Sequence, residues 1–179
     1  MISFRVAEAK ARARTGGFEQ SCTDETGQLL AVLAGSMRDA PILEIGSGRG
    51  VGTAWLASTA TVRVVRELMQ DVPGVEVVHG DGEEALSHGP FGLVFVDAAV
   101  TKHGAVDTVV EALVPGGLIL LDDLTPQDQW PTEWVGQPDN VRDRWLSHPS
   151  LQAVALVLAG GVAVAVFHHV FRTSPGRSA

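Results

Sequence analysis

The sequence predicts a single α/β domain built on a doubly wound, mostly parallel sheet. Short and nearly continuous apolar runs recur from residue 40 onward, separated by segments with a helical pattern, as is typical of parallel strands covered on both faces. The first of these runs, Ile42–Ile45, leads into a turn with a glycine at every second position, Gly46, Gly48 and Gly50. The 179 residues, 45% of them hydrophobic, suffice for one well-buried core.

The N-terminal part predicts two helices. Alanines and charges at helical spacing continue to Arg14, and Thr15-Gly16-Gly17 then breaks the pattern. A second helix is predicted to follow Thr23 as its N-cap, with an apolar face of Leu29, Leu30, Val32 and Leu33. We therefore divide the single domain, 1–179, into a helical lead-in (1–39), a sheet core (40–171) and a frayed tail (172–179).

Four buried strands and a closing hairpin are predicted for the core. The strands are placed at 42–45, 75–78, 93–96 and 118–121, the last of them after a turn at Pro115-Gly116-Gly117. Two β-branched runs around Gly160-Gly161 predict an antiparallel hairpin within 151–171. Because this apolar stretch is interrupted by glycines and polar residues, it is not expected to span a membrane.

Composition and charge exclude several classes of function. The net charge is −8, and basic residues cluster only near the N-terminus, so no face is expected to neutralise the phosphates of a nucleic acid. Cys22 is the single cysteine, which excludes an intramolecular disulfide, and it is expected to be a small buried hydrophobe. The first residues show no signal-peptide pattern. These features predict a cytoplasmic protein with a small-molecule partner.

The alternating glycines predict a turn that brings bare backbone close to a ligand. Glycine accepts φ > 0 and has no Cβ, and the start of the next helix offers unpaired N–H groups. A dinucleotide-binding turn would carry a third glycine or alanine where this chain has Val51. The turn therefore disfavours NAD.

Several motifs in order resemble those of one enzyme family. They are the Thr-x-x-x-Gly-Gln-x-Leu segment from Thr23 to Leu30, Glu44 before the glycine turn, His79-Gly80-Asp81-Gly82, the Phe-Gly-Leu-Val-Phe-Val-Asp-Ala run at 91–98, Pro115-Gly116-Gly117 and Asp122-Asp123. Together they resemble class I S-adenosylmethionine-dependent methyltransferases of the catechol and caffeoyl-coenzyme A O-methyltransferase type, including small bacterial relatives.

The resemblance implies a set of cofactor-binding residues. Gly46, Ser47, Gly48 and Gly50 would approach the amino-acid part of S-adenosylmethionine, and Asp81-Gly82 would lie beside its adenine. Independently of the family, ligands of open α/β sheets bind at the carboxyl ends of the strands. Glu44, Asp81, Asp97 and Asp122 all come at or just past such ends, so we expect them to meet at one edge, with Glu44 and Asp97 also at the cofactor.

The resemblance also implies a divalent-cation site and a general base. Asp97 and Asp122 match two metal ligands of the family, while Asp123 replaces an amide, and carboxylates suit Mg²⁺ or Ca²⁺. Such a cation could lower the pKa of an acceptor hydroxyl. Lys102 is the candidate base, and its neighbour His103 has a similar claim. The alternative for the three aspartates is that they are ordinary polar residues at strand ends.

One segment departs from the family pattern. The family has a further strand, ending in an acidic residue for the ribose, and then a helix before the strand at 75–78, but here only one of these fits. A helix at 60–71 is our preferred interpretation because Arg-Glu-Leu-Met is helix-prone. The alternative places a strand at 61–66 with Glu67 as the ribose acid.

The sequence therefore predicts an S-adenosylmethionine-dependent methyltransferase that acts on the oxygen of a small molecule, with a divalent cation as a candidate cofactor. A homodimer through the N-terminal helices is compatible with this function. Two rivals stay open: a nucleotide-sugar or NAD-binding enzyme, and a binding protein that keeps the fold but has lost cofactor use or catalysis. The chain has no tyrosine, which argues against a tyrosine-using reductase.

Overall fold

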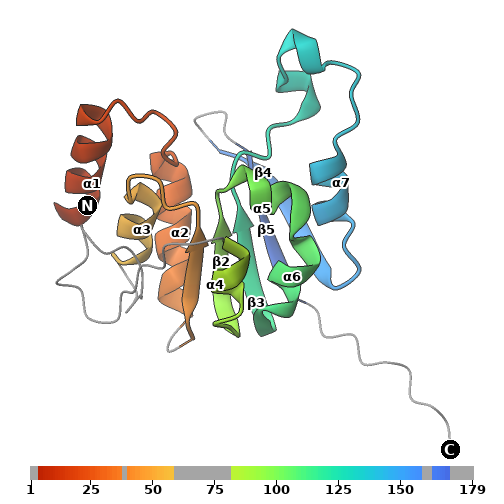
Figure 1. Cartoon of the computed structure of the whole chain (residues 1–179), viewed down its shortest axis with the longest axis horizontal. Coiled ribbons are helices and arrows are strands. Elements are labelled where there is room, and N and C mark those ends of the chain that lie inside the picture. The colour runs from red at the N-terminus through yellow and green to blue at the C-terminus, as the bar shows by residue number, and fades with distance from the viewer. Residues whose placement is uncertain (1–3, 38–39, 59–81, 159–162, 170–179) are drawn as a thin grey trace, which may run out of the picture.

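The described part of the chain is an α/β structure around one mixed sheet (Figure 1). The computed structural model describes residues 4–37, 40–58, 82–158 and 163–169. Within them the strand order is β1-β2-β3-β5-β4. The strands are β1 (Ile42–Ile45), β2 (Phe91–Val96), β3 (Leu113–Leu121), β4 (Leu151–Val157) and β5 (Ala163–His169).

Strands β1, β2 and β3 are parallel, as predicted. Strand β5 is antiparallel to both β3 and β4. The residues that connect β4 to β5 lie outside the described ranges, so the predicted turn at Gly160-Gly161 is not tested.

Helices cover both faces of this sheet. On one side are α1 (Phe4–Thr15), α2 (Asp24–Ser36) and α3 (Val51–Leu56), and on the other are α4 (Gly82–Leu86), α5 (Ala99–Gly104), α6 (Val106–Glu111) and α7 (Asn140–Leu146) (Figure 1). Two short 3₁₀ helices, η1 (Gln127–Gln129) and η2 (Thr132–Trp134), precede α7.

Strand β2 divides the core into two apolar clusters. Leu93 and Phe95 pack with α1, α2 and α3, whereas Val94 and Val96 pack with α6 and α7. Alternate residues of a strand point to opposite faces, and every residue of β2 is buried. The continuous apolar pattern of this strand is therefore explained by cover on both sides.

Helix α2 begins where the sequence predicted, and its buried face agrees with the prediction except at one residue. The Thr23 hydroxyl accepts a hydrogen bond from the backbone N–H of Thr26, which confirms the N-cap. Leu30 is fully buried, and Leu29 and Leu33 are partly buried against the same cluster, as predicted, whereas Val32 is 70% exposed. The buried residues of the helix are Thr26, Gly27, Leu30, Ala31 and Ala34, and small residues predominate among them because α2 packs closely against α3.

Strand β3 begins earlier than predicted. It starts at Leu113 rather than at residue 118, and the Pro115-Gly116-Gly117 signal lies inside it. Phe91 of β2 is opposite Leu113, but Leu93 is already opposite Leu118, so the register shifts across this signal. Gly116 supplies the positive φ of 81° that the irregularity requires.

Several predictions fall outside the described residues. They are the strand at 75–78, the alternatives of a helix at 60–71 or a strand at 61–66 with Glu67, Asp81 of the adenine motif, and the tail at 172–179.

The contact of Gly27 with Trp55 gives a test of the packing between α2 and α3. A Cβ at Gly27 would lie 2.1 Å from Nε1 of Trp55, which is only 5% exposed. Overpacking costs about 1–3 kcal/mol, and an overlap as deep as this one belongs to the upper part of that range, about 2–3 kcal/mol. Alanine gains roughly 1 kcal/mol over glycine inside a helix, which offsets part of this cost. We expect Gly27→Ala to lower the free energy of unfolding by about 1–2 kcal/mol in urea denaturation. Gly104→Ala in α5, where a Cβ has no atom within 4 Å, is the matched control and should not lower the free energy of unfolding. Equal free energies of unfolding for the two variants would contradict the packing argument.

Candidate functional site at the carboxyl ends of the parallel strands

The glycine turn after β1 lies directly against the end of β2. Gly46, Gly48 and Gly50 all have positive φ, at 98°, 49° and 80°. A Cβ at Gly46 would lie 2.8 Å from the backbone nitrogen of Ala98, so no larger residue fits. The prediction that this turn depends on bare backbone agrees with this geometry, and α3 begins immediately after it at Val51.

Glu44 is a buried carboxylate beneath this turn. It is 7% exposed, and the Thr53 hydroxyl of α3 donates a hydrogen bond to it. A Cβ at Gly52 would lie 2.4 Å from its Oε1 atom, so α3 passes close above the carboxylate. Burial raises the pKa of Glu44 to about 7, and the Thr53 hydrogen bond opposes that rise.

The parallel register brings the ends of three strands together. The N–H of Asp97 donates to the carbonyl of Ile45 at 2.9 Å, and the N–H of Asp122 donates to the carbonyl of Val96 at 3.2 Å. Asp97 and Asp122 therefore follow β2 and β3 at the same edge where β1 enters its turn. This arrangement agrees with the expectation that Glu44, Asp97 and Asp122 meet at one edge of the sheet.

Lys102 of α5 lies between two carboxylates of this edge. Its Nζ is 3.3 Å from Oδ2 of Asp123 and 3.6 Å from Oδ1 of Asp97. The lysine side chain is only 11% exposed, and that of Asp97 is 16% exposed. The neighbouring His103 is exposed, so of the two candidate bases Lys102 is the one that faces the aspartates.

The two inner aspartates are held in a poorly solvated environment. Burial raises the pKa of Asp97 to about 6, an effect that Lys102 opposes. Burial, followed by the nearby charge of Asp123, raises the pKa of Asp122 to about 7. Asp122 is 2% exposed, and its Oδ1 has no hydrogen-bond partner within the described part of the chain.

The described carboxylates do not fit a divalent-cation site. No group of three or more His, Cys, Asp or Glu side chains suited to a metal ion occurs within residues 4–37, 40–58, 82–158 and 163–169. The position between Asp97 and Asp123 is taken by an ammonium group, and the Asp123 side chain is 65% exposed. The cation implied by the resemblance stays a prediction, and no chemical step below depends on it.

The remaining predicted residues lie around the same edge. Gly82 begins α4, and a Cβ there would lie 2.5 Å from Cγ2 of Ile45, so the glycine packs against the end of β1. Ser47 is half-buried within the turn. Sequence reasoning missed Thr53, which contacts Glu44, and Trp145, whose Nε1 donates to the carbonyl of Lys102 at 2.8 Å.

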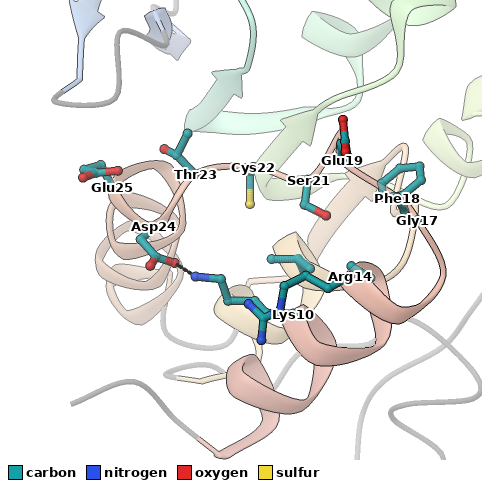
Figure 2. Close-up of a pocket in the computed structure, with 12 residues that line it drawn as sticks. Lys10, Arg14, Gly17, Phe18, Glu19, Ser21, Cys22, Thr23, Asp24 and Glu25 are labelled. Carbon is teal, nitrogen blue, oxygen red and sulfur yellow. Dashed lines mark hydrogen bonds and ion pairs between the residues drawn. The ribbon is translucent and has the colours of Figure 1, made fainter.

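A pocket adjoins the turn on the side of α1. The pocket has a volume of about 540 Å³. Figure 2 shows Ser21 and Cys22 directed into it, with the ion pair of Lys10 and Asp24 across it. Cys22 is buried, as predicted; burial and the nearby carboxylates, Asp122 foremost among them, raise the pKa of its thiol. The same linker places the ring of Phe18 2.9 Å from where a Cβ of Gly48 would be, so it covers the outer side of the turn.

Two tryptophans in the segment before α7 contact each other. The rings of Trp130 and Trp134 meet edge to face with centroids 6.0 Å apart, and Nε1 of Trp130 donates to the carbonyl of Thr125.

The fold is shared with solved methyltransferase structures. No protein-family model matches the chain, and no curated protein matches it either. Cofactor-bound Rv0187 from MTB has 24% identity and a TM-score of 0.76, with 93% of this chain and 90% of that chain covered. An O-methyltransferase from Bacillus cereus in complex with SAH has 20% identity and a TM-score of 0.73, with 94% and 91% covered.

A third structure extends the range of these neighbours. The O-methyltransferase TomG from Streptomyces achromogenes, involved in tomaymycin synthesis and solved with SAM, has 18% identity and a TM-score of 0.68, with 94% of this chain and 91% of that chain covered. No helix among the described residues of this chain is long and apolar enough to cross a membrane.

The three neighbours together define the fold. The chain has the Rossmann-like fold of S-adenosylmethionine-dependent O-methyltransferases over nearly its whole length.

Proposed function

We propose that this chain is an S-adenosylmethionine-dependent methyltransferase that acts on the oxygen of a small molecule. The observation that carries the proposal is the turn after β1. Its backbone is bare at Gly46, lies against the start of the β2–α5 connection, and sits above the buried Glu44. The likeness of the fold to O-methyltransferases solved with SAM or SAH supports the same conclusion.

The turn fits the proposed cofactor. Positive φ angles at the alternate residues Gly46, Gly48 and Gly50 leave the turn without Cβ atoms at these positions, although the ring of Phe18 covers the outer side at Gly48. Glu44 beneath the turn and Asp97 beside it supply negative charge, which suits a ligand that carries a sulfonium and an ammonium group. Gly82 lies at the same edge, on the side proposed for the adenine.

Asp97 and Lys102 are proposed to act on the acceptor. S-adenosylmethionine, when bound, supplies a methyl group on a positively charged sulfur. The chain must hold an acceptor oxygen in line with that methyl group, and positioning can supply much of the rate. As the O–CH₃ bond forms and the S–CH₃ bond breaks, we propose that Asp97 takes the proton of the acceptor hydroxyl. A carboxylate with a pKa of about 6 suits this task near neutral pH.

The acceptor is proposed to be a small molecule rather than a nucleic acid. The net charge of −8 disfavours a polyanion.

Cofactor binding is tested by Gly46→Ala. Alanine would be strained at φ 98°, and its Cβ would overlap the backbone of Ala98. We expect isothermal titration with S-adenosylmethionine to show saturable binding by the wild type and at least about tenfold weaker binding by the variant. The matched control is Gly136→Ala, which has a similar φ of 85° with open space around it and should bind as the wild type does.

Three results would change the proposal. Wild-type binding of NAD without binding of S-adenosylmethionine would contradict it and favour the dinucleotide rival. Binding of neither ligand would contradict it as well. Cofactor binding without transfer of labelled methyl to any of a panel of hydroxylated small molecules would favour the non-catalytic rival.

The pH dependence of cofactor binding tests the role of Glu44. A cationic ligand favours the ionised carboxylate, and the pKa of Glu44 is raised to about 7. We therefore expect the affinity for S-adenosylmethionine to rise by roughly three- to tenfold from pH 6 to pH 8 as Glu44 loses its proton. Asp97 and Asp122 at the same edge have pKa values raised to about 6 and about 7, so they also ionise in this range. Glu44→Gln should therefore make the rise smaller without abolishing it, whereas Glu111→Gln, at an exposed residue of α6, should leave it unchanged. An equal slope in all three proteins would show that Glu44 does not face the cofactor.

A further inference from the structure

The ammonium of Lys102 stands where carboxylates of two strand ends converge. It donates a hydrogen bond to Asp123 after β3 and forms an ion pair with Asp97 after β2. Both contacts are made by a side chain that is almost withdrawn from solvent. The lysine thus links the two connections that leave β2 and β3.

The backbone of Lys102 is fixed from the far side. Trp145 of α7, which is fully buried, donates its indole N–H to the carbonyl of Lys102. Arg144 donates to the carbonyl of His103 at 2.5 Å. Helix α7 therefore holds α5 so that the lysine side chain extends toward the aspartates.

Asp123 is turned toward the lysine by an uncommon backbone conformation. Its φ of 53° is the one positive value at a non-glycine residue in the described ranges. Aspartate accepts this left-handed region better than most residues. The resemblance places an amide here, and amides also accept this region. The difference is therefore one of charge, and the additional negative charge is compensated by Lys102.

An ammonium group at this position can supply part of the positive charge that a divalent cation would supply. It forms ion pairs with two carboxylates, whose charge it offsets in part, and has three N–H donors, one of which is used on Asp123. A remaining donor can hold the acceptor oxygen and stabilise negative charge that develops on it. The nearby Oδ1 of Asp122, buried and without a partner among the described residues, is a further hydrogen-bond acceptor at this edge.

We infer that Lys102, held by Asp97, Asp123 and α7, replaces a divalent cation at this edge, so that the acceptor oxygen is bound by an ammonium group and methyl transfer needs no metal. This inference rests on the proposed function for its chemistry. Its central claim, that the lysine occupies the cation position, can be tested without any methyl acceptor.

The test is a titration of the full chain with Mn²⁺, in which the free ion is counted by its electron paramagnetic resonance signal. We expect no saturable binding by the wild type. Lys102→Met removes the charge but keeps the length of the side chain, and it should bind Mn²⁺ because Asp97 and Asp123 then face each other without a counter-charge. Lys102→Arg keeps the charge and should bind none. Lys102→Gln replaces the methionine variant if that protein does not fold.

Either of two results would overturn the inference. Saturable Mn²⁺ binding by the wild type that is lost in Asp97→Asn would show that the metal site exists beside the lysine. Absence of binding in the wild type and in the uncharged variants alike would show that these carboxylates form no cation position for the lysine to fill. Failure of S-adenosylmethionine binding would refute the proposed function alone and would leave the Mn²⁺ result standing.

Discussion

The close approach of Gly46 to the backbone after β2 is the constraint on which the rest of the site depends. A Cβ at this position would meet Ala98 nitrogen at 2.8 Å, so the turn can lie against the next strand only because that atom is missing. This approach places Glu44 under the turn and sets α3 above it. It also brings the start of α5, and with it Lys102, to the same edge. The missing Cβ of Gly46 thus brings the glycine turn close to Asp97 and Lys102.

A second coupling runs through the opposite layer of helices. The hydrogen bond from Trp145 to the carbonyl of Lys102 joins α7 to α5 inside the apolar cluster that also contains Val94 and Val96. The position of the lysine is therefore determined by core packing rather than by its flexible side chain alone. Residues far along the sequence from the glycine turn consequently take part in shaping the site.

Much of the framework could be predicted because its signals are local. The run at 42–45 became β1 without change, and Thr23 caps α2 as its residue type indicated. Val32 was wrongly assigned because hydrophobicity alone was counted. The face that α2 buries also depends on the close approach of Trp55, which the missing Cβ of Gly27 allows. The length of β3 was missed because Pro115-Gly116-Gly117 indicates a turn, and nothing local shows that the strand resumes its pairing beyond it.

The residues of the candidate site could be predicted from the sequence, but the contacts between their side chains could not. The carboxylates could be placed at strand ends from chain order, since parallel strands end at a common edge. Lys102 could be named as a candidate at this edge, but its ion pairs with Asp97 and Asp123 could not be predicted, because they depend on the position of α5, which Trp145 and Arg144 of α7 hold by hydrogen bonds. Burial raises the pKa values of Glu44, Asp97 and Asp122, so the negative charges at this edge are poorly solvated. Under the proposed function a cationic cofactor supplies positive charge that offsets them. The demethylated cofactor has lost the sulfonium charge, so the carboxylates at this edge would bind it less tightly. The negative charge that favours binding of S-adenosylmethionine would therefore also favour release of the demethylated product.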